Sequence, residues 1–169
     1  MERKSNKERI HIADFNPDVT SLKIAHQDFF NEMQSFNAGE GYQNFKDFIL
    51  EEAEEYRDTG DGATYVVWNV IYDETGAEQT REIVSFYTLA TTAIPYEDRI
   101  RLDADEAKEL GKEFDSQICG IPALEIKMFA VDEKYQDLFY EYQGEDLPIS
   151  AWIMRSIVAY ANELINDIV

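Results

Sequence analysis

The sequence has little cysteine, few basic side chains and no long apolar segment. Its one cysteine, Cys119, has no partner for an intrachain disulfide, which is typical of proteins from a reducing compartment. No stretch comes near the roughly 18 apolar residues of a membrane span. The first twelve residues, MERKSNKERIHI, lack the apolar core of a signal peptide. We therefore expect a cytoplasmic protein that makes no contact with membranes.

Motifs for several kinds of chemistry are missing as well. His11 and His26 have no histidine or cysteine neighbour at the spacing of metal ligands, so we expect no metal site. Glycine-rich nucleotide loops and the nucleophile motif of hydrolases do not occur. Cys119 lacks a neighbouring base in the sequence and is interpreted as a small buried residue rather than a nucleophile.

Acidic residues outnumber basic ones by 35 to 15, which gives a formal net charge of −20. Four of the basic residues lie in the first twelve positions, and residues 13–169 hold 11 basic and 33 acidic side chains. Because nucleic acids and anionic membranes are bound through lysine and arginine, we expect neither as a partner. The charge favours a cation instead, either an amine or a basic protein, and it would also suit a mimic of nucleic acid.

Hydrophobic residues make up 44% and aromatic residues 13% of the chain, which is enough for a folded core. We expect a flexible arm at residues 1–8 and a single domain over residues 9–169. The spacing of apolar residues between turn residues predicts an α/β fold in layers. The expected strands are 9–15, 63–72, 82–90 and 123–131, and the expected helices are 19–36, 42–57, 104–114 and 148–167, with residues 132–147 as a loop.

This order of elements, the strand Ala123–Val131 and the pair Gln143-Gly144 resemble the GCN5-related N-acetyltransferase (GNAT) family. The resemblance implies the acyl-CoA N-acyltransferase fold, a mixed sheet with two helices after the first strand and one helix after the fourth. It also implies acetyl-CoA as cosubstrate, with the fourth strand binding the pantetheine arm and a loop before the next helix binding the pyrophosphate. The matching positions are Phe129, Ala130 and Val131 for the strand and Gln143, Gly144 and Ser150 for the loop.

The loop allows two alignments with the family. Tyr135-Gln136-Asp137 offers a second match, and either choice requires an insertion or a broken loop. In the first alignment, Asp146 and Pro148 stand where the family has small residues; Asp146 adds a negative charge and Pro148 removes an amide donor. The family also continues with further strands, so two expectations stay open: either the chain is a fragment that lacks the C-terminal part of the fold, or strand 123–131 has an open edge that a second copy or another protein covers.

Glu125 is the candidate general base, because it lies on the strand segment where several GNAT relatives place theirs. It would accept a proton from an ammonium group before the nitrogen attacks the thioester. Tyr142, beside the loop, is the candidate acid for the leaving thiolate. The alternatives are that Glu125 and Lys127, which share a strand face, are an ordinary surface pair, and that Tyr142 packs the loop onto the domain.

Two functions are consistent with these observations. The first is transfer of an acetyl group from acetyl-CoA to an amine of a small cation or a protein. The second is a non-catalytic acidic interaction module, either a degenerate acetyltransferase scaffold or a nucleic-acid mimic that binds a basic protein. Glu125 and the pair Gln143-Gly144 favour the first, whereas Asp146, Pro148 and the net charge of −20 favour the second.

Overall fold

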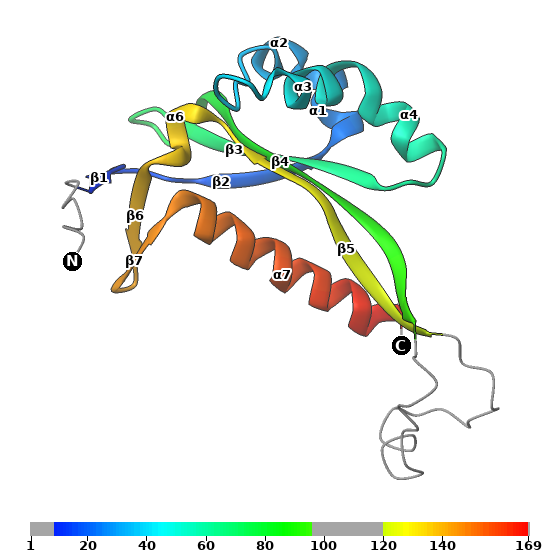
Figure 1. Cartoon of the computed structure of the whole chain (residues 1–169). Coiled ribbons are helices and arrows are strands. Elements are labelled where there is room, and N and C mark those ends of the chain that lie inside the picture. Colours follow the sequence, from blue (N-terminus) through cyan, green and yellow to red (C-terminus); the bar gives the residue numbers. More distant parts are fainter. Residues whose placement is uncertain (1–8, 96–119, 169) are drawn as a thin grey trace, which may run out of the picture.

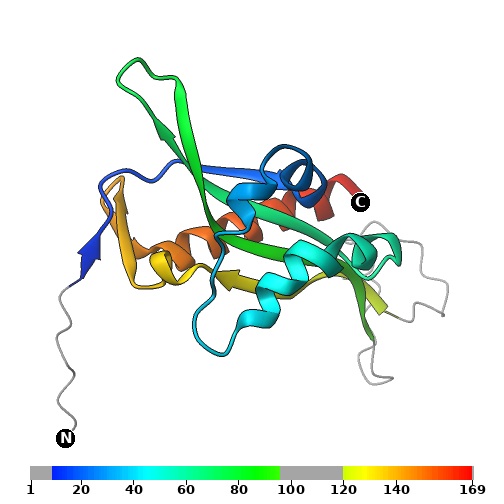
Figure 2. The ribbon, with the colours of Figure 1, turned by 90° about the horizontal axis from the view of Figure 1, so that it is seen from above.

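The computed structural model describes residues 9–95 and 120–168, so the helix expected at 104–114 and Cys119 lie outside the described residues. Its centre is a four-stranded antiparallel sheet in the order β2-β3-β4-β5. Helices α1 to α4 cover one face of this sheet and the long helix α7 crosses the other, which confirms the layered α/β fold (Figures 1 and 2). The strands are Pro17–Ser21 (β2), Ala63–Tyr72 (β3), Glu78–Pro95 (β4) and Gly120–Val131 (β5).

The side chains of the central strands explain why these segments form buried strands. β3 carries β-branched and aromatic residues on both faces, and helices cover both faces, so every residue from Val66 to Val70 is buried. Its bounds agree with the strand expected at 63–72. A turn at Asp73, whose carboxylate accepts hydrogen bonds from the backbone of Thr75 and Ala77, leads into β4, which extends beyond the expected 82–90 at both ends.

The N-terminal segment differs from the expectation of a strand over 9–15 and a helix from residue 19. Strand β1 spans only Ile10–His11, and the strand that joins the main sheet is β2, which pairs with Tyr65 to Asn69 of β3. Pro17 is compatible with β2 because proline is tolerated at the first residue of a strand. Backbone pairing of residues 17–21 with β3 outweighs the helical spacing of apolar residues that predicts a helix from residue 19. The helices therefore begin later, as α1 (Leu22–Asp28) and α2 (Phe30–Met33).

The second helical segment, expected over 42–57, is present as three consecutive pieces. They are α3 (Gln43–Asp47), a π-helical turn η1 (Phe48–Glu52) and α4 (Ala53–Asp58). Phe48 and Ile49 of the π-helical turn are buried against the sheet. After α4 the chain passes close to β4 at Gly62, where a Cβ atom would lie only 2.8 Å from Cγ2 of Thr88, so this position requires glycine.

Residues 132–147, expected to be a loop, fold instead into a short helix and a β-hairpin. The helix α6 spans Glu133–Gln136, and the hairpin consists of β6 (Leu138–Tyr142) and β7 (Glu145–Pro148). β1 pairs with β6 in parallel and completes a second, small sheet in the order β1-β6-β7. Helix α7 (Ile149–Ile168) follows directly and confirms the helix expected at 148–167.

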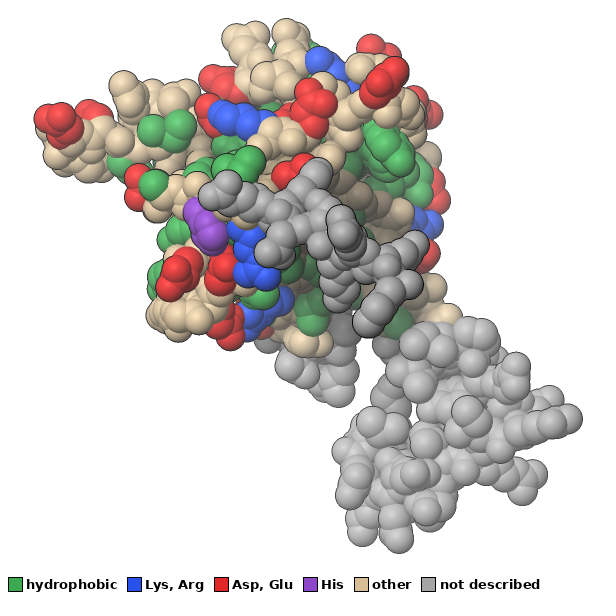
Figure 3. Space-filling model, turned by 60° about the vertical axis from the view of Figure 1, so that its left-hand side comes forward, with side chains coloured by type: hydrophobic (Ala, Val, Ile, Leu, Met, Phe, Trp, Pro, Cys, Tyr) green, Lys and Arg blue, Asp and Glu red, His purple; other side chains and the backbone are tan. Residues whose placement is uncertain are grey.

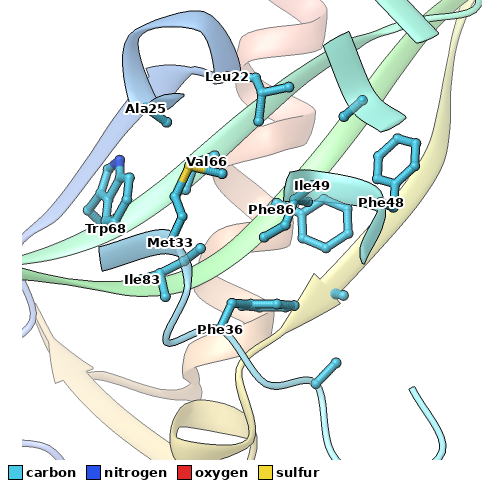
Figure 4. Packing of buried hydrophobic residues seen from close by; sticks show 13 residues of the cluster. Leu22, Ala25, Met33, Phe36, Phe48, Ile49, Val66, Trp68, Ile83 and Phe86 are labelled. Atoms are coloured by element: carbon cyan, nitrogen blue, oxygen red, sulfur yellow. The ribbon is translucent and has the colours of Figure 1, made fainter. Parts of the chain in front are cut away.

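Two apolar clusters hold the layers together, one on each face of the main sheet. Between the sheet and α1–α4, the ring of Phe86 packs against those of Phe36 and Phe48, with centroids 5.5 and 6.0 Å apart (Figure 4). The partly buried ring of Phe45 lies 6.0 Å from it as well. On the other face, α7 contributes three buried side chains, Ile149, Ile153 and Ile157.

No helix in the described part of the chain is long and apolar enough to cross a membrane.

Candidate functional site

The last strand of the main sheet, β5, has one neighbour among the described strands and therefore an open edge. Its pairing with β4 is interrupted in the middle: Met128 opposes Thr88, but Ile126 opposes Leu89, so Lys127 is an extra residue in β5. Such a β-bulge bends the strand and increases its twist, and bulges are enriched at sheet edges and next to active sites. The bulge divides β5 into a C-terminal half and an N-terminal half that pair with β4 in registers shifted by one residue.

The C-terminal half of β5 presents backbone groups to the open edge. The N–H of Asp132 donates to the carbonyl of Val84 at 2.8 Å, so Asp132 and Val84 form a hydrogen-bonded pair at the end of the β4–β5 ladder. Because such pairs alternate along an antiparallel ladder, the peptide groups of Phe129 and Val131 face away from β4, whereas those of Ala130 face it. The carbonyl of Val131 accepts a hydrogen bond from the side chain of Gln136 at 2.9 Å.

A small pocket of about 250 Å³ lies beside this edge, on the side of the sheet covered by the helices. Glu125 points to the same side. Its neighbour Ile126 opposes Leu89, which packs on the α7 side, and because successive side chains alternate, Glu125 and its partner Ala90 point to the other side. Glu125 is exposed, and Lys127 lies 5.9 Å from the ring of Tyr56 on this side as well. The pocket is lined by Asn44, Phe45, Asp47, Phe48, Glu52 and Met128.

The segment that follows β5 has its amide groups engaged within the chain. At the start of α6, the N–H groups of Glu133, Lys134 and Tyr135 donate to Asn37 O, Asp132 Oδ1 and Asp132 O at 2.7, 3.0 and 2.9 Å. The second oxygen of Asp132 accepts the N–H of Asn37 at 2.8 Å, which ties the loop after α2 to this helix. The first turn of α6 therefore has no free amide to offer to a phosphate group.

Gln136, the glutamine of the alternative alignment, also has a structural role. Its Nε2 donates to the carbonyls of Ala38 and Val131, both at 2.9 Å, and so closes the gap between the loop after α2 and the end of β5. Next to it, the buried Tyr135 donates its hydroxyl proton to Glu82 at 2.6 Å. Hydrogen bonds from Lys134 and Tyr135 to Glu82 lower the pKa of that carboxyl group, and burial raises the pKa of Tyr135.

Gln143 and Gly144, expected to bind the pyrophosphate, form the tip of the β6–β7 hairpin. Both have positive φ angles, 53° and 82°, which is the conformation of a tight hairpin turn. Tyr142 precedes the turn, is half exposed, and stands 6.1 Å from the ring of Trp152. Ser150 lies in the first turn of α7. Figure 1 places this hairpin at the opposite end of the sheet from the N-terminal half of β5, so the structure does not bring Tyr142 next to Glu125.

Two acidic residues of the hairpin, Glu145 and Asp146, are paired with basic ones. Asp146 receives a hydrogen bond from Arg9 at 2.8 Å and lies 3.0 Å from Nε2 of His11, and Glu145 pairs with Arg155. Desolvation acts to raise the pKa of Asp146, but the hydrogen bonds from Arg9 and His11 outweigh it and lower that pKa. On the side of the molecule shown in Figure 3, basic side chains and a histidine lie beside acidic ones rather than in a patch of their own.

Sequence reasoning missed two features of the site. The acids of the pocket, Asp47 and Glu52, were not singled out, because acidic residues on a helix usually belong to a solvated face. The role of Asp132 had a visible signal, since aspartate directly before a short helix is a frequent N-cap. Among the described residues, no group of three or more His, Cys, Asp or Glu side chains could hold a metal ion.

Comparisons with known proteins concern the fold. Neither the protein-family models nor the curated proteins give a match. A crystal structure of a mutant of KacT, an acetyltransferase toxin with the GNAT fold, aligns with a TM-score of 0.51 and 12% identity, covering 86% of this chain and 68% of that one. The chain has the GNAT fold. The resemblance in the order of its elements is thus confirmed at the level of architecture.

Two further solved structures are more distant. AtaTR bound with AcCoA aligns at a TM-score of 0.45 and 14% identity, covering 86% of this chain and 85% of that one. AtaT complexed with acetyl-methionyl-tRNAfMet aligns at 0.44 and 16%, covering 77% and 80%. Because both TM-scores are below 0.5, the assignment of the fold rests on the KacT structure. The tRNA in the second of these structures is a partner of AtaT and is not transferred to this chain.

Proposed function

We propose that the protein is an N-acetyltransferase that moves an acetyl group from acetyl-CoA to an amine of a small cation or a basic protein. One observation carries the proposal: in a GNAT fold, the bulged open edge of β5 runs beside an acidic pocket. The edge supplies backbone groups for an extended thioester arm. The pocket supplies carboxylates for a positively charged acceptor.

The cosubstrate would bind along the C-terminal half of β5. The outward N–H and C=O groups of Phe129 and the outward N–H of Val131 can pair with the amides of a pantetheine arm as an added strand would, and Ala130 between them keeps the strand anchored to β4. The carbonyl of Val131 is already bound by Gln136. Gln143, Gly144 and Ser150 would reach the pyrophosphate only if the coenzyme extended towards the hairpin. Since the amides of α6 are already bonded, we expect the pantetheine arm to supply most of the affinity.

The acceptor would enter the pocket as an ammonium ion, attracted by Asp47 and Glu52. Glu125, on the same side of β5, would take a proton from it directly or through water. The neutral nitrogen then attacks the acetyl carbonyl, the C–S bond breaks, and the thiolate of CoA leaves and is protonated. Tyr142 is left out of this scheme, because its hairpin lies at the other end of the sheet.

Release of free thiol from acetyl-CoA in the presence of a polyamine tests the proposal, and Glu125→Gln is the decisive variant. We expect it to lower the rate at least about 100-fold, the lower range for a general base, with little change in acetyl-CoA affinity. Glu74→Gln, an exposed acid in the turn between β3 and β4, is the matched control and should keep the full rate. An unchanged rate in Glu125→Gln would remove Glu125 from the mechanism.

A second function is favoured by the closed first turn of α6, which offers no amide to a phosphate group. The scaffold would then be a non-catalytic acidic module that binds a basic protein, with a strand of that partner or of a second copy covering the β5 edge. It predicts no binding of acetyl-CoA at millimolar concentration and a dimer or a salt-sensitive complex instead. Size-exclusion chromatography with light scattering, at low and high salt, distinguishes these outcomes from catalysis.

A further inference from the structure

A large hollow of about 1040 Å³ lies on the α7 side of the sheet, away from the β5 pocket. Its walls come from β2, β3, β4, the β6 strand of the hairpin and α7. Three residues of α7 spaced by four, Trp152, Ser156 and Tyr160, form one wall. We call it the aromatic hollow after six of its lining residues: Tyr65, Tyr87, Tyr140, Tyr142, Trp152 and Tyr160.

Three tyrosines form the first corner of the aromatic hollow. The rings of Tyr65 and Tyr87 are stacked, with centroids 5.2 Å apart and an interplanar angle of 19°. Tyr160 of α7 stands across Tyr65 at 5.8 Å and 74°. The corner thus has two aromatic walls at nearly a right angle. Burial raises the pKa of both Tyr65 and Tyr87 to about 12, so these phenols stay neutral at physiological pH.

The second corner repeats this arrangement with residues of the hairpin. Tyr140 and Tyr142 are stacked, with centroids 6.3 Å apart and an angle of 14°. Trp152 stands across them at 66° and 80°. The indole is held in place, because its Nε1 donates to the carbonyl of Tyr140 at 3.0 Å. Tyr142 is half exposed, so this corner is open to a ligand from solvent.

The charges of the aromatic hollow favour a cation. Among the described residues that line it, the charged ones are Asp18, Glu78 and Arg81. These three side chains lie at the β2 rim of the hollow, towards the helix-covered face: Arg81 is bound to both carboxylates, at 3.3 Å and 2.7 Å, and its guanidinium stacks on Phe29 at 3.8 Å. Arg81 is therefore not free to meet an anion. The described lining of the hollow therefore offers no free basic side chain to an anionic ligand.

We propose that the aromatic hollow is a binding site for an organic cation that carries an alkylated ammonium group. Faces of neutral Tyr and Trp rings attract such a group through their negative π-clouds, and perpendicular rings offer several faces at once. The apolar walls accept the alkyl groups, and no basic side chain of the described lining is free to repel the cation. This site is separate from the proposed acetyl-transfer site, because it lies on the opposite face of the sheet.

Isothermal titration of the full chain with choline and with its neutral isostere, 3,3-dimethyl-1-butanol, tests the proposal. The two probes have the same shape and differ in the charge of one atom. We expect choline to bind at least about tenfold more tightly than the isostere, the preference of a partly desolvated aromatic site for a cation. Tyr142→Ala, a change at a half-exposed ring, should weaken choline binding several-fold without unfolding the protein.

Tyr42→Ala is the matched control, since Tyr42 is a similarly exposed tyrosine, beside α3 on the other face of the sheet. It should leave choline affinity unchanged. Equal affinities for choline and its isostere would overturn the proposal, and so would the absence of choline binding at 10 mM, a concentration about tenfold above a millimolar dissociation constant. Equal weakening by Tyr42→Ala and Tyr142→Ala would overturn it as well, because the binding would then not be at the aromatic hollow.

Discussion

Asp132→Ala removes the carboxylate that joins the end of β5 to the loop after α2. The residue is only 7% exposed, and its two oxygens accept the N–H groups of Asn37 at 2.8 Å and Lys134 at 3.0 Å. The hydrogen bond from the Asn37 N–H is part-buried, and leaving this donor without its partner costs about 2 kcal/mol. Loss of the N-cap at Lys134 costs about 1 kcal/mol more, because that amide can turn to water. We therefore expect a loss of about 3 kcal/mol in the free energy of unfolding.

Urea unfolding followed by circular dichroism measures this loss, with the m-value expected to stay constant. For a chain of this size the same loss lowers Tm by about 6–12 °C. Asp137→Ala is the matched control: it removes an exposed acid five positions further on and should change the free energy by less than about 0.5 kcal/mol. A loss below about 1 kcal/mol for Asp132→Ala, or equal losses in the two variants, would refute the reasoning.

Two other changes test the fold. Gly62→Ala places a Cβ atom 2.8 Å from Cγ2 of Thr88 and should destabilise the protein by about 1–3 kcal/mol, measured by the same unfolding; an unchanged value would show that this contact is not tight. Glu82→Gln tests the ion pair with Lys134. Because the folded state lowers the pKa of Glu82, its contribution is present at neutral pH and disappears as pH falls below about 4.5. The stability difference between wild type and Glu82→Gln, below about 1 kcal/mol for so exposed a pair, should vanish in acid; a constant difference would contradict this.

The centre of the fold could be predicted from the sequence because its signals are local and strong. The run from Ala63 to Tyr72 is apolar on both faces, and only a central strand covered on two sides accommodates that pattern. The apolar stripe after Pro148 likewise predicted helix α7. The N-terminal segment could not be assigned in this way, because the pairing of β2 with β3 is a long-range contact that the spacing of Val19 and its neighbours does not reveal.

The candidate site was predicted less completely, for a related reason. A family motif directed attention to Gln143-Gly144, whereas the alternation of the preceding residues 138–142 and the glycine itself are signals of a hairpin. The strand edge at Phe129–Val131 was anticipated from the resemblance, and the structure shows which of its peptide groups face outward. The bulge at Lys127 depends on the pairing with β4, and the hydrogen bonds of Asp132 depend on the loop after α2. Neither can be predicted from a local sequence pattern.

The central claim is that the open edge of β5 binds the pantetheine arm of an acyl-CoA. Calorimetric titration with acetyl-CoA and with acetyl-pantetheine, which lacks the nucleotide, tests it most directly. We predict that both bind with millimolar or better dissociation constants and that their affinities differ by less than about tenfold, or 1.4 kcal/mol, since the amides of α6 are not free for the phosphates. No binding of either compound at several millimolar, or a preference for acetyl-CoA above about 100-fold, would contradict the account.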